Sequence, residues 1–145
     1  AGSSTISSPL AAVGGSTLRI LGTSSSGSAT VTVSAGLLND GAIELVSAVS
    51  SYSENLIVTG GQLVNSATGT ITSLVGTGGA RTITAAVNNQ GSIKVAPGAG
   101  QLLTISGTLT NASSGSIDLD LGGLVAGSAV ARAWGDAARG LATPR

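Results

Sequence analysis

The chain has 145 residues, of which 41% are hydrophobic and 8% charged, and six basic residues balance six acidic ones. The length suits one domain, the apolar content excludes a disordered chain, and the sparse, balanced charge excludes the electrostatic footprint of a nucleic-acid-binding protein. Cysteine and histidine are absent, which removes disulfides, thiol chemistry and the commonest metal-ligating and general-base side chain.

The apolar residues are almost all aliphatic. Phe and Met are absent, and Tyr52 and Trp134 are the only aromatic residues. A thick globular core normally draws on aromatic residues, because each of them buries a large area. The composition therefore predicts a narrow interior between thin sheets. No apolar run approaches the about 20 residues that a membrane-spanning helix needs.

A three-segment unit recurs along the chain. Each copy has a short alternating apolar run, a corner of small residues, Leu-x-Asn or a close variant, a second corner, and Gly-x-Ile. A degenerate copy occupies 5–20, and further copies occupy 31–45, 56–73, 81–95 and 103–119. The central apolar residue of the first run advances in steps of 27, 25, 25 and 22, through Ile6, Val33, Val58, Ile83 and Ile105. A self-similar unit of this length predicts a repeat architecture.

Alternation with period two, as in residues 31–33, is typical of strands with one buried face. A meander of antiparallel hairpins would not explain why equivalent positions recur at this spacing. Winding each unit into one coil and stacking the coils explains it directly. We therefore expect an all-β, single-stranded parallel β-helix (β-solenoid) of about five coils over residues 1–123, with stacked strands ~4.8 Å apart.

The third strand of each coil supports this register. Its inward positions are apolar in almost every coil, and they read Leu18, Ile43, Ile71, Ile93, Ile117 and then Ile20, Leu45, Ser73, Val95, Leu119. The outward residue between them alternates in charge, which predicts an inter-coil charge column made of Arg19, Glu44, Lys94 and Asp118. Opposite charges on neighbouring strands contribute about 0.2–1 kcal/mol each. A charged binding strip is the alternative interpretation of this column.

One corner of each coil carries asparagine. Stacked amides can bond to one another and to the corner backbone, because each has donors and an acceptor. We expect a structural ladder here, with sugar or metal binding as the alternative. Its members are Asn39, Asn65, Asn89 (or Asn88) and Asn111.

The first strand of each coil carries hydroxyl residues on both sides of its central residue. If that residue points inward, two ranks of hydroxyl groups line a flat outward face, ~7 Å apart along the strand and ~4.8 Å apart between coils. Ile57 interrupts one rank. The face resembles the Thr-x-Thr face of solenoid ice-binding proteins, and ordinary cross-strand pairing is the alternative. Its residues are Thr5, Ser7, Thr32, Ser34, Thr59, Thr82, Thr84, Thr104 and Ser106.

The links between coils vary most, and the longest covers residues 47–55. Insertions in solenoids collect on one edge, which is often the contact surface. Tyr52 and Glu54 are therefore the candidate contact residues of this link, with an ordinary solvent loop as the alternative.

The three-segment repeat does not continue over residues 124–145. Val130, Ala133, Trp134, Ala137, Ala138 and Leu141 fall at helical spacing. This pattern predicts a short C-terminal helix that could cover the last coil, whose strand edges are otherwise open. A truncated or foreign end is the alternative for this atypical tail.

Catalysis is not expected. Polysaccharide-cleaving β-helix enzymes need clustered acids, bases or metal ligands in a groove. The only close carboxylates are Asp118 and Asp120, ~7 Å apart on one outward face. We therefore expect no enzymatic activity, no cofactor and no metal site.

The Leu-x-Asn and Gly-x-Ile units, together with Ile117-Asp-Leu-Asp-Leu-Gly-Gly123, resemble the repeat passengers of bacterial autotransporters and filamentous-haemagglutinin-like adhesins. The resemblance covers roughly residues 1–127 and implies a right-handed parallel β-helix. It also implies export to the outer cell surface and a role in adhesion to a host surface or glycan, or as a rigid stalk. The open ends of such a solenoid add axial self-association into fibres to these expectations.

Overall fold

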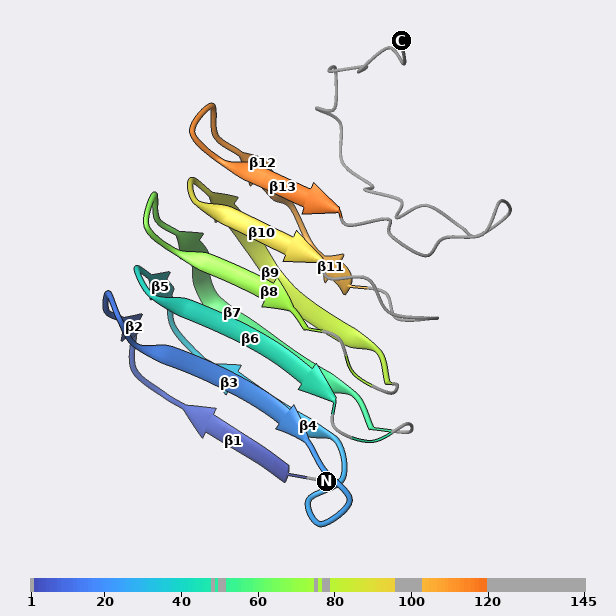
Figure 1. Ribbon diagram of the computed structural model, residues 1–145. Coiled ribbons are helices and arrows are strands. Elements are labelled where there is room, and N and C mark those ends of the chain that lie inside the picture. The colour runs from blue at the N-terminus through green and yellow to red at the C-terminus, as the bar shows by residue number, and fades with distance from the viewer. Residues whose placement is uncertain are drawn as a thin grey trace, which may run out of the picture.

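The computed structural model describes residues 2–47, 49, 52–74, 76, 79–95 and 103–119. These residues form thirteen β-strands and no helix, and every pair of strands is parallel. Figure 1 shows the strands stacked in successive rungs from the N-terminal to the C-terminal end. The expected all-β solenoid is confirmed, with about four turns separating the first rung from the last.

Each coil supplies one rung, and its strands follow the three predicted segments. The strands are β1 (Gly2–Ile6), β2 (Leu10–Ala12), β3 (Thr17–Gly22), β4 (Ala29–Val33), β5 (Leu37–Asn39), β6 (Ala42–Ser47), β7 (Glu54–Asn65), β8 (Thr70–Ser73), β9 (Arg81–Asn89), β10 (Ser92–Val95), β11 (Leu103–Ser106), β12 (Leu109–Asn111) and β13 (Ser116–Leu119). In the third and fourth coils, β7 and β9 continue through the first corner, so that one strand takes the place of two. The first and second columns of strands thereby join into one eight-stranded sheet, and β3, β6, β8, β10 and β13 form a five-stranded sheet.

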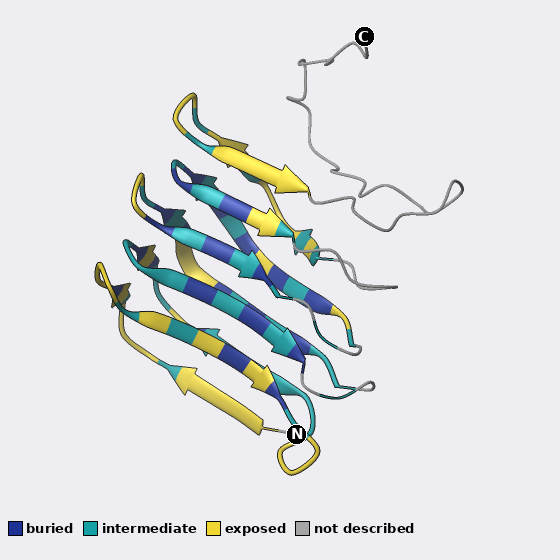
Figure 2. Cartoon of the chain, viewed as in Figure 1, coloured by how far each residue is buried: buried dark blue, intermediate teal, exposed yellow. Residues whose placement is uncertain are grey.

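The core lies between these two sheets. In the described residues, every buried hydrophobic side chain is Ala, Ile, Leu or Val, as a narrow interior requires. The third column has the expected register, with Ile43, Ile71 and Ile93 stacked and fully buried. Figure 2 shows buried positions alternating with partly exposed ones along the middle strands, while the end strands are mostly exposed.

The first column differs from the expected register between the third and fourth coils. Val33 stacks on Val58 as predicted, but Ile83 stacks on Leu56, two residues earlier. The cause is the corner inside β7, which has three more residues between Ile57 and Gln62 than β9 has at the same place. A two-residue shift keeps every side chain on its own face, so the alternating pattern could not distinguish the two registers.

The predicted C-terminal helix and the tail over residues 124–145 lie outside the described residues. So do Asp120 and the rest of the solenoid expected up to residue 123. Within the described part of the chain, no helix is long and apolar enough to cross a membrane.

Candidate functional site

The structure brings the four predicted asparagines into one continuous ladder. Asn39 Nδ2 donates to Asn65 Oδ1 at 2.7 Å, Asn65 Nδ2 donates to Asn89 Oδ1 at 2.7 Å, and Asn89 Nδ2 donates to Asn111 Oδ1 at 2.6 Å. The first three asparagines are fully buried. The position in the fourth coil is Asn89, because Asn88 is on the opposite side of β9 and only half-buried.

Each buried amide also bonds to a backbone carbonyl of the next coil. The acceptors are the carbonyl oxygens of Thr70 at 3.0 Å, Ser92 at 3.3 Å and Ser116 at 3.1 Å. A carbonyl oxygen only accepts, so these bonds fix the amide nitrogens toward the C-terminal end of the stack. The ladder therefore has one donor direction throughout, and neighbouring amides polarise one another.

The glycine of Gly-x-Ile makes room for this ladder. A Cβ on Gly69 would collide with the Asn39 carbonyl oxygen and the Asn65 amide oxygen. At Gly115 it would lie 2.6 Å from Asn111 Oδ1, closer than real Cβ atoms approach, and at Gly91 it would be in tight contact with Asn65 Nδ2 at 3.0 Å and would collide with the carbonyl oxygens of Gly69 and Ser66. The spacing of Leu-x-Asn and Gly-x-Ile is thus a packing requirement, since backbone carbonyl oxygens and the asparagine amides together occupy the space that a side chain would need.

The two ends of the ladder differ. In the first coil Ala12 takes the place of asparagine beside Asn39. Asn39 Oδ1 is consequently buried without a hydrogen-bond partner among the described residues. At the other end, Asn111 is exposed, and its Nδ2 donates to the carbonyl oxygen of Gly115 at 2.9 Å. The buried members are enclosed and their N–H groups engaged, which leaves them no surface for a sugar.

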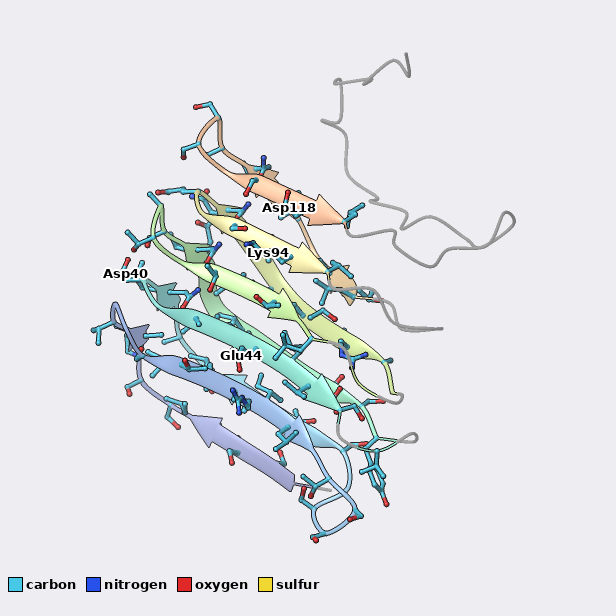
Figure 3. The ribbon with its side chains drawn as sticks, viewed as in Figure 1. Asp40, Glu44, Lys94 and Asp118 are labelled. Carbon is cyan, nitrogen blue, oxygen red and sulfur yellow. The ribbon has the colours of Figure 1, made fainter. Side chains whose placement is uncertain are left out.

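The charge column has the predicted register. Arg19 lies beside Glu44, and Lys94 lies beside Asp118, with Thr72 between the two pairs. Figure 3 shows Lys94 and Asp118 on neighbouring strands and Glu44 on the same sheet, with β8 between Glu44 and Lys94. Arg19 Nε and Glu44 Oε2 are 2.7 Å apart, the only ion pair in the described part of the chain. Such an exposed pair contributes at most about 1 kcal/mol.

The hydroxyl face points outward, but its ranks differ from the expected ones because of the two-residue shift. The expected pairing of Ser34 and Thr59 with Thr84 is wrong, since β9 places Thr84 beside Ile57. Ser7, Ser34 and Thr59 each follow the last paired residue of the first column in their coil and lie at the first corner. One observed rank is Thr5, Thr32, Ile57, Thr84, Ser106, and the other is Ser3, Thr30, Asn55, Thr82, Thr104.

The sequence reasoning missed Ser3, Thr30 and Asn55 as members of this face. Asn55 Nδ2 donates to Thr30 Oγ1 at 3.3 Å, so part of the second rank bonds within itself. The available signal was the alternation of β4 and β7, which places residues 30 and 55 in phase with the outward Thr32 and Ile57.

Of the two contact residues predicted in the link over residues 47–55, the structure contradicts Glu54. Tyr52 precedes β7 and is partly buried. Glu54 is not in a loop at all: it is the first residue of β7 and is 0% exposed. Glu54 is two residues before Leu56 and four before Val58, so the alternation of the strand indicated that its side chain points inward.

Beside Glu54 in the next coil lies Arg81, which is also 0% exposed and was missed by the sequence analysis. Burial raises the pKa of Glu54, and the nearby Arg81 opposes this shift. Burial likewise lowers the pKa of the Arg81 guanidinium, with Glu54 opposing. The Gly22 backbone and the Ser47 hydroxyl also lower the pKa of Glu54. The Glu54 carboxylate and the Arg81 guanidinium have no hydrogen bond of good geometry with a described residue. The interior therefore holds an acidic and a basic side chain next to each other at the interface of the third and fourth coils.

In the described residues no group of three or more Asp, Glu, His or Cys side chains could hold a metal ion. No protein-family model, no curated protein and no solved structure matches the chain. The geometry defines the class: the chain is a β-solenoid repeat protein whose turns are joined by a buried asparagine ladder.

Proposed function

We propose that the protein is a structural rod of the cell surface, a rigid stalk or a segment of a longer fibre, and that it is not an enzyme. The observation that carries this proposal is that the polar side chains named above lie between successive turns. The asparagine amides, the Arg19–Glu44 pair and the buried Glu54 and Arg81 all lie between one turn and the next. A rigid repeat protein needs polar interactions of this kind between its turns, since each turn contacts only its neighbours.

The surface location and an adhesive role extend this proposal. The likeness of the repeat to autotransporter and haemagglutinin-like passengers supports them, as do strands rich in Ser, Thr, Gly and Asn without cysteine. In this setting, the ligand would be a host surface or a glycan. The outward hydroxyl ranks are the part of the described surface that repeats with the solenoid.

Protease shaving of intact source cells tests the location. An antibody against the chain should label unpermeabilised cells, and added protease should remove that label. Labelling that requires permeabilisation would contradict the surface proposal. For the enzymatic alternative, incubation with a panel of polysaccharides should give no cleavage; cleavage that Asp118→Asn abolishes would overturn the structural role.

Ice binding is the second candidate, supported by the two outward ranks. Neighbouring residues of each rank lie ~4.8 Å apart, and the ranks lie ~7 Å apart. Four of the five residues in each rank carry a hydroxyl group, with Ile57 and Asn55 as the exceptions. Thr82→Tyr would interrupt the rank that has no aliphatic member, whereas Glu44→Gln lies on the other sheet and serves as control. Thermal hysteresis abolished by the first variant and retained in the second would make ice binding the leading function.

A further inference from the structure

The C-terminal rung is an open continuation of the core. Within the described residues, β11, β12 and β13 pair only with the fourth coil. Ile117 and Leu119 are 42% and 41% exposed, although they extend columns in which Ile93 is only 1% exposed. An exposed strand edge with apolar residues beside it is a template for further strand pairing.

The N-terminal rung is open on the opposite side. The strands β1, β2 and β3 pair only with the second coil in the described part of the chain. Leu10 and Leu18 are half-buried members of the core at this end. The two ends therefore present matching incomplete cores, each with three strands that run in the same direction as all the others.

Extending the observed register by one step brings these rungs together. The sequence of pairs from Ser116 through Ser92, Thr70 and Ala42 leads to Thr17. A further step from the C-terminal rung of one copy to the N-terminal rung of a second therefore places Ile117 on Leu18, Leu119 on Ile20 and Asp118 beside Arg19. By the same extension in the second column, Leu109 of the first copy lies on Leu10 of the second.

The first column fits this contact less well in the same register, because Ile105 would lie on Ser4. A shift of two residues places Ile105 on Ile6 instead. The solenoid already accommodates such a shift in this column between Val58 and Ile83, so the mismatch does not prevent stacking.

Charge selects the orientation of the contact. Asp118 has no ion pair with a described residue, and the Arg19 side chain is 57% exposed and uses Nε for Glu44. A guanidinium has five N–H donors, so Arg19 retains donors for a second carboxylate. Stacking the C-terminal rung on the N-terminal rung continues the alternation of charge. Two C-terminal rungs facing each other would instead bring two Asp118 carboxylates together, at a cost.

We propose that the partner of the C-terminal rung is the N-terminal rung of a second copy, joined head to tail in parallel register with Asp118 beside Arg19. This inference rests on the structural role proposed above and names the partner of the rod. A head-to-tail contact of this kind does not close, so it generates a filament. Each copy adds five rungs, or ~24 Å of length.

Two charge reversals in the full-length chain test the contact. Asp118→Arg alone would place Arg beside Arg19, and Arg19→Asp alone would place Asp beside Asp118, so each variant should need at least tenfold more protein to assemble. An equal mixture of the two variants should assemble as the unmodified chain does, because the copies can alternate. Asp40→Arg makes the same change of charge at a corner of the second coil and should have no effect. Light scattering against concentration, with negative-stain microscopy, gives the readout.

Mixing changes no contact within a chain, so rescue cannot come from refolding. Circular dichroism of each variant establishes that it is folded. If either variant is unfolded, the pair Arg19→Cys and Asp118→Cys in one chain replaces this test. The chain has no other cysteine, and facing strand positions have a Cα separation that suits a disulfide. Oxidation should then produce a ladder of covalent multimers, while each single cysteine variant should stop at a dimer.

An unmodified chain that stays monomeric at every concentration would overturn the inference. Filaments that form equally well with both charge reversals, or a double cysteine variant that stops at a dimer, would overturn it too. None of these outcomes affects the surface labelling that tests the structural role. The two proposals therefore fail separately.

Discussion

Removing one amide from the middle of the asparagine ladder should destabilise the protein far more than removing the amide at its end. Asn65 accepts from Asn39 and donates to both Asn89 and the Ser92 carbonyl oxygen. Asn65→Ala leaves three buried polar atoms without these bonds. The Asn39 amide nitrogen keeps its bond to Thr70. At about 1–2 kcal/mol for each group left unpaired, the expected loss is about 3–5 kcal/mol.

The matched control is Asn111→Ala. Asn111 accepts the same kind of bond from Asn89, but it is exposed, so water can replace the lost partner. We expect a loss of about 1 kcal/mol there. Urea unfolding followed by circular dichroism measures both variants. Equal losses at the two positions, or a loss below 1 kcal/mol for Asn65→Ala, would refute the argument that burial makes the ladder stabilising.

The substitution Asn65→Asp tests the donor direction. The introduced carboxylate can still accept from Asn39, but it presents an acceptor to the acceptor oxygen of Asn89. Burial and this repulsion raise the pKa of the introduced carboxyl above its unfolded value. Its favourable contribution is therefore present below the unfolded pKa and lost as pH rises through the folded pKa. The variant should gain stability relative to the unmodified chain as pH falls from 7 to 4, and a parallel pH profile would contradict the assigned direction.

Four further results are expected from the same unfolding assay. Arg81→Met alone should cost about 3–5 kcal/mol by leaving the buried Glu54 without its neighbouring guanidinium, whereas Glu54→Leu with Arg81→Met should recover most of that loss. Because the folded pKa of Glu54 is raised above its ordinary 4.5, its contribution is lost as pH rises through the folded pKa, and the unmodified chain should show a fall that Glu54→Gln lacks. Gly69→Ala should cost more than about 2 kcal/mol through its collision with the ladder, while Gly36→Ala, where a Cβ meets nothing closer than 3.7 Å, should cost little. Glu44→Lys should cost under about 1 kcal/mol, and less at high salt.

The third column and the ladder were predictable because their signals are both periodic and specific. Asn39 and Gly69 belong to a motif in which each residue type has a steric or hydrogen-bonding reason at its position. In the third strand, Arg19 and Glu44 identify one register among its neighbours through their charges. Each of these positions carries information beyond the distinction between apolar and polar.

The first column could not be predicted in the same way. Leu56 and Val58 are equally good partners for Ile83, because aliphatic side chains two residues apart share one face and nearly one shape. Glu54 was assigned to a surface link because it falls in the longest connection between coils. Charged residues are almost never fully buried unless they are paired, so its inward position depends on a neighbour of opposite charge. Its partner Arg81 is 27 residues away in a different repeat, so nothing local in the sequence indicated the pairing.

The buried charges lie at the very interface where the aliphatic pattern allows two registers. In the register with Val58 on Ile83, Arg81 would face Leu56, and Glu54 would face Gly79, so both charges would be buried among neutral neighbours. The observed register places Glu54 and Arg81 side by side. Leaving two isolated buried charges costs far more than exchanging one aliphatic contact for another. Glu54 and Arg81 therefore select one register between two turns whose aliphatic side chains would allow either. A stack of identical hydrophobic coils would lack this positional information.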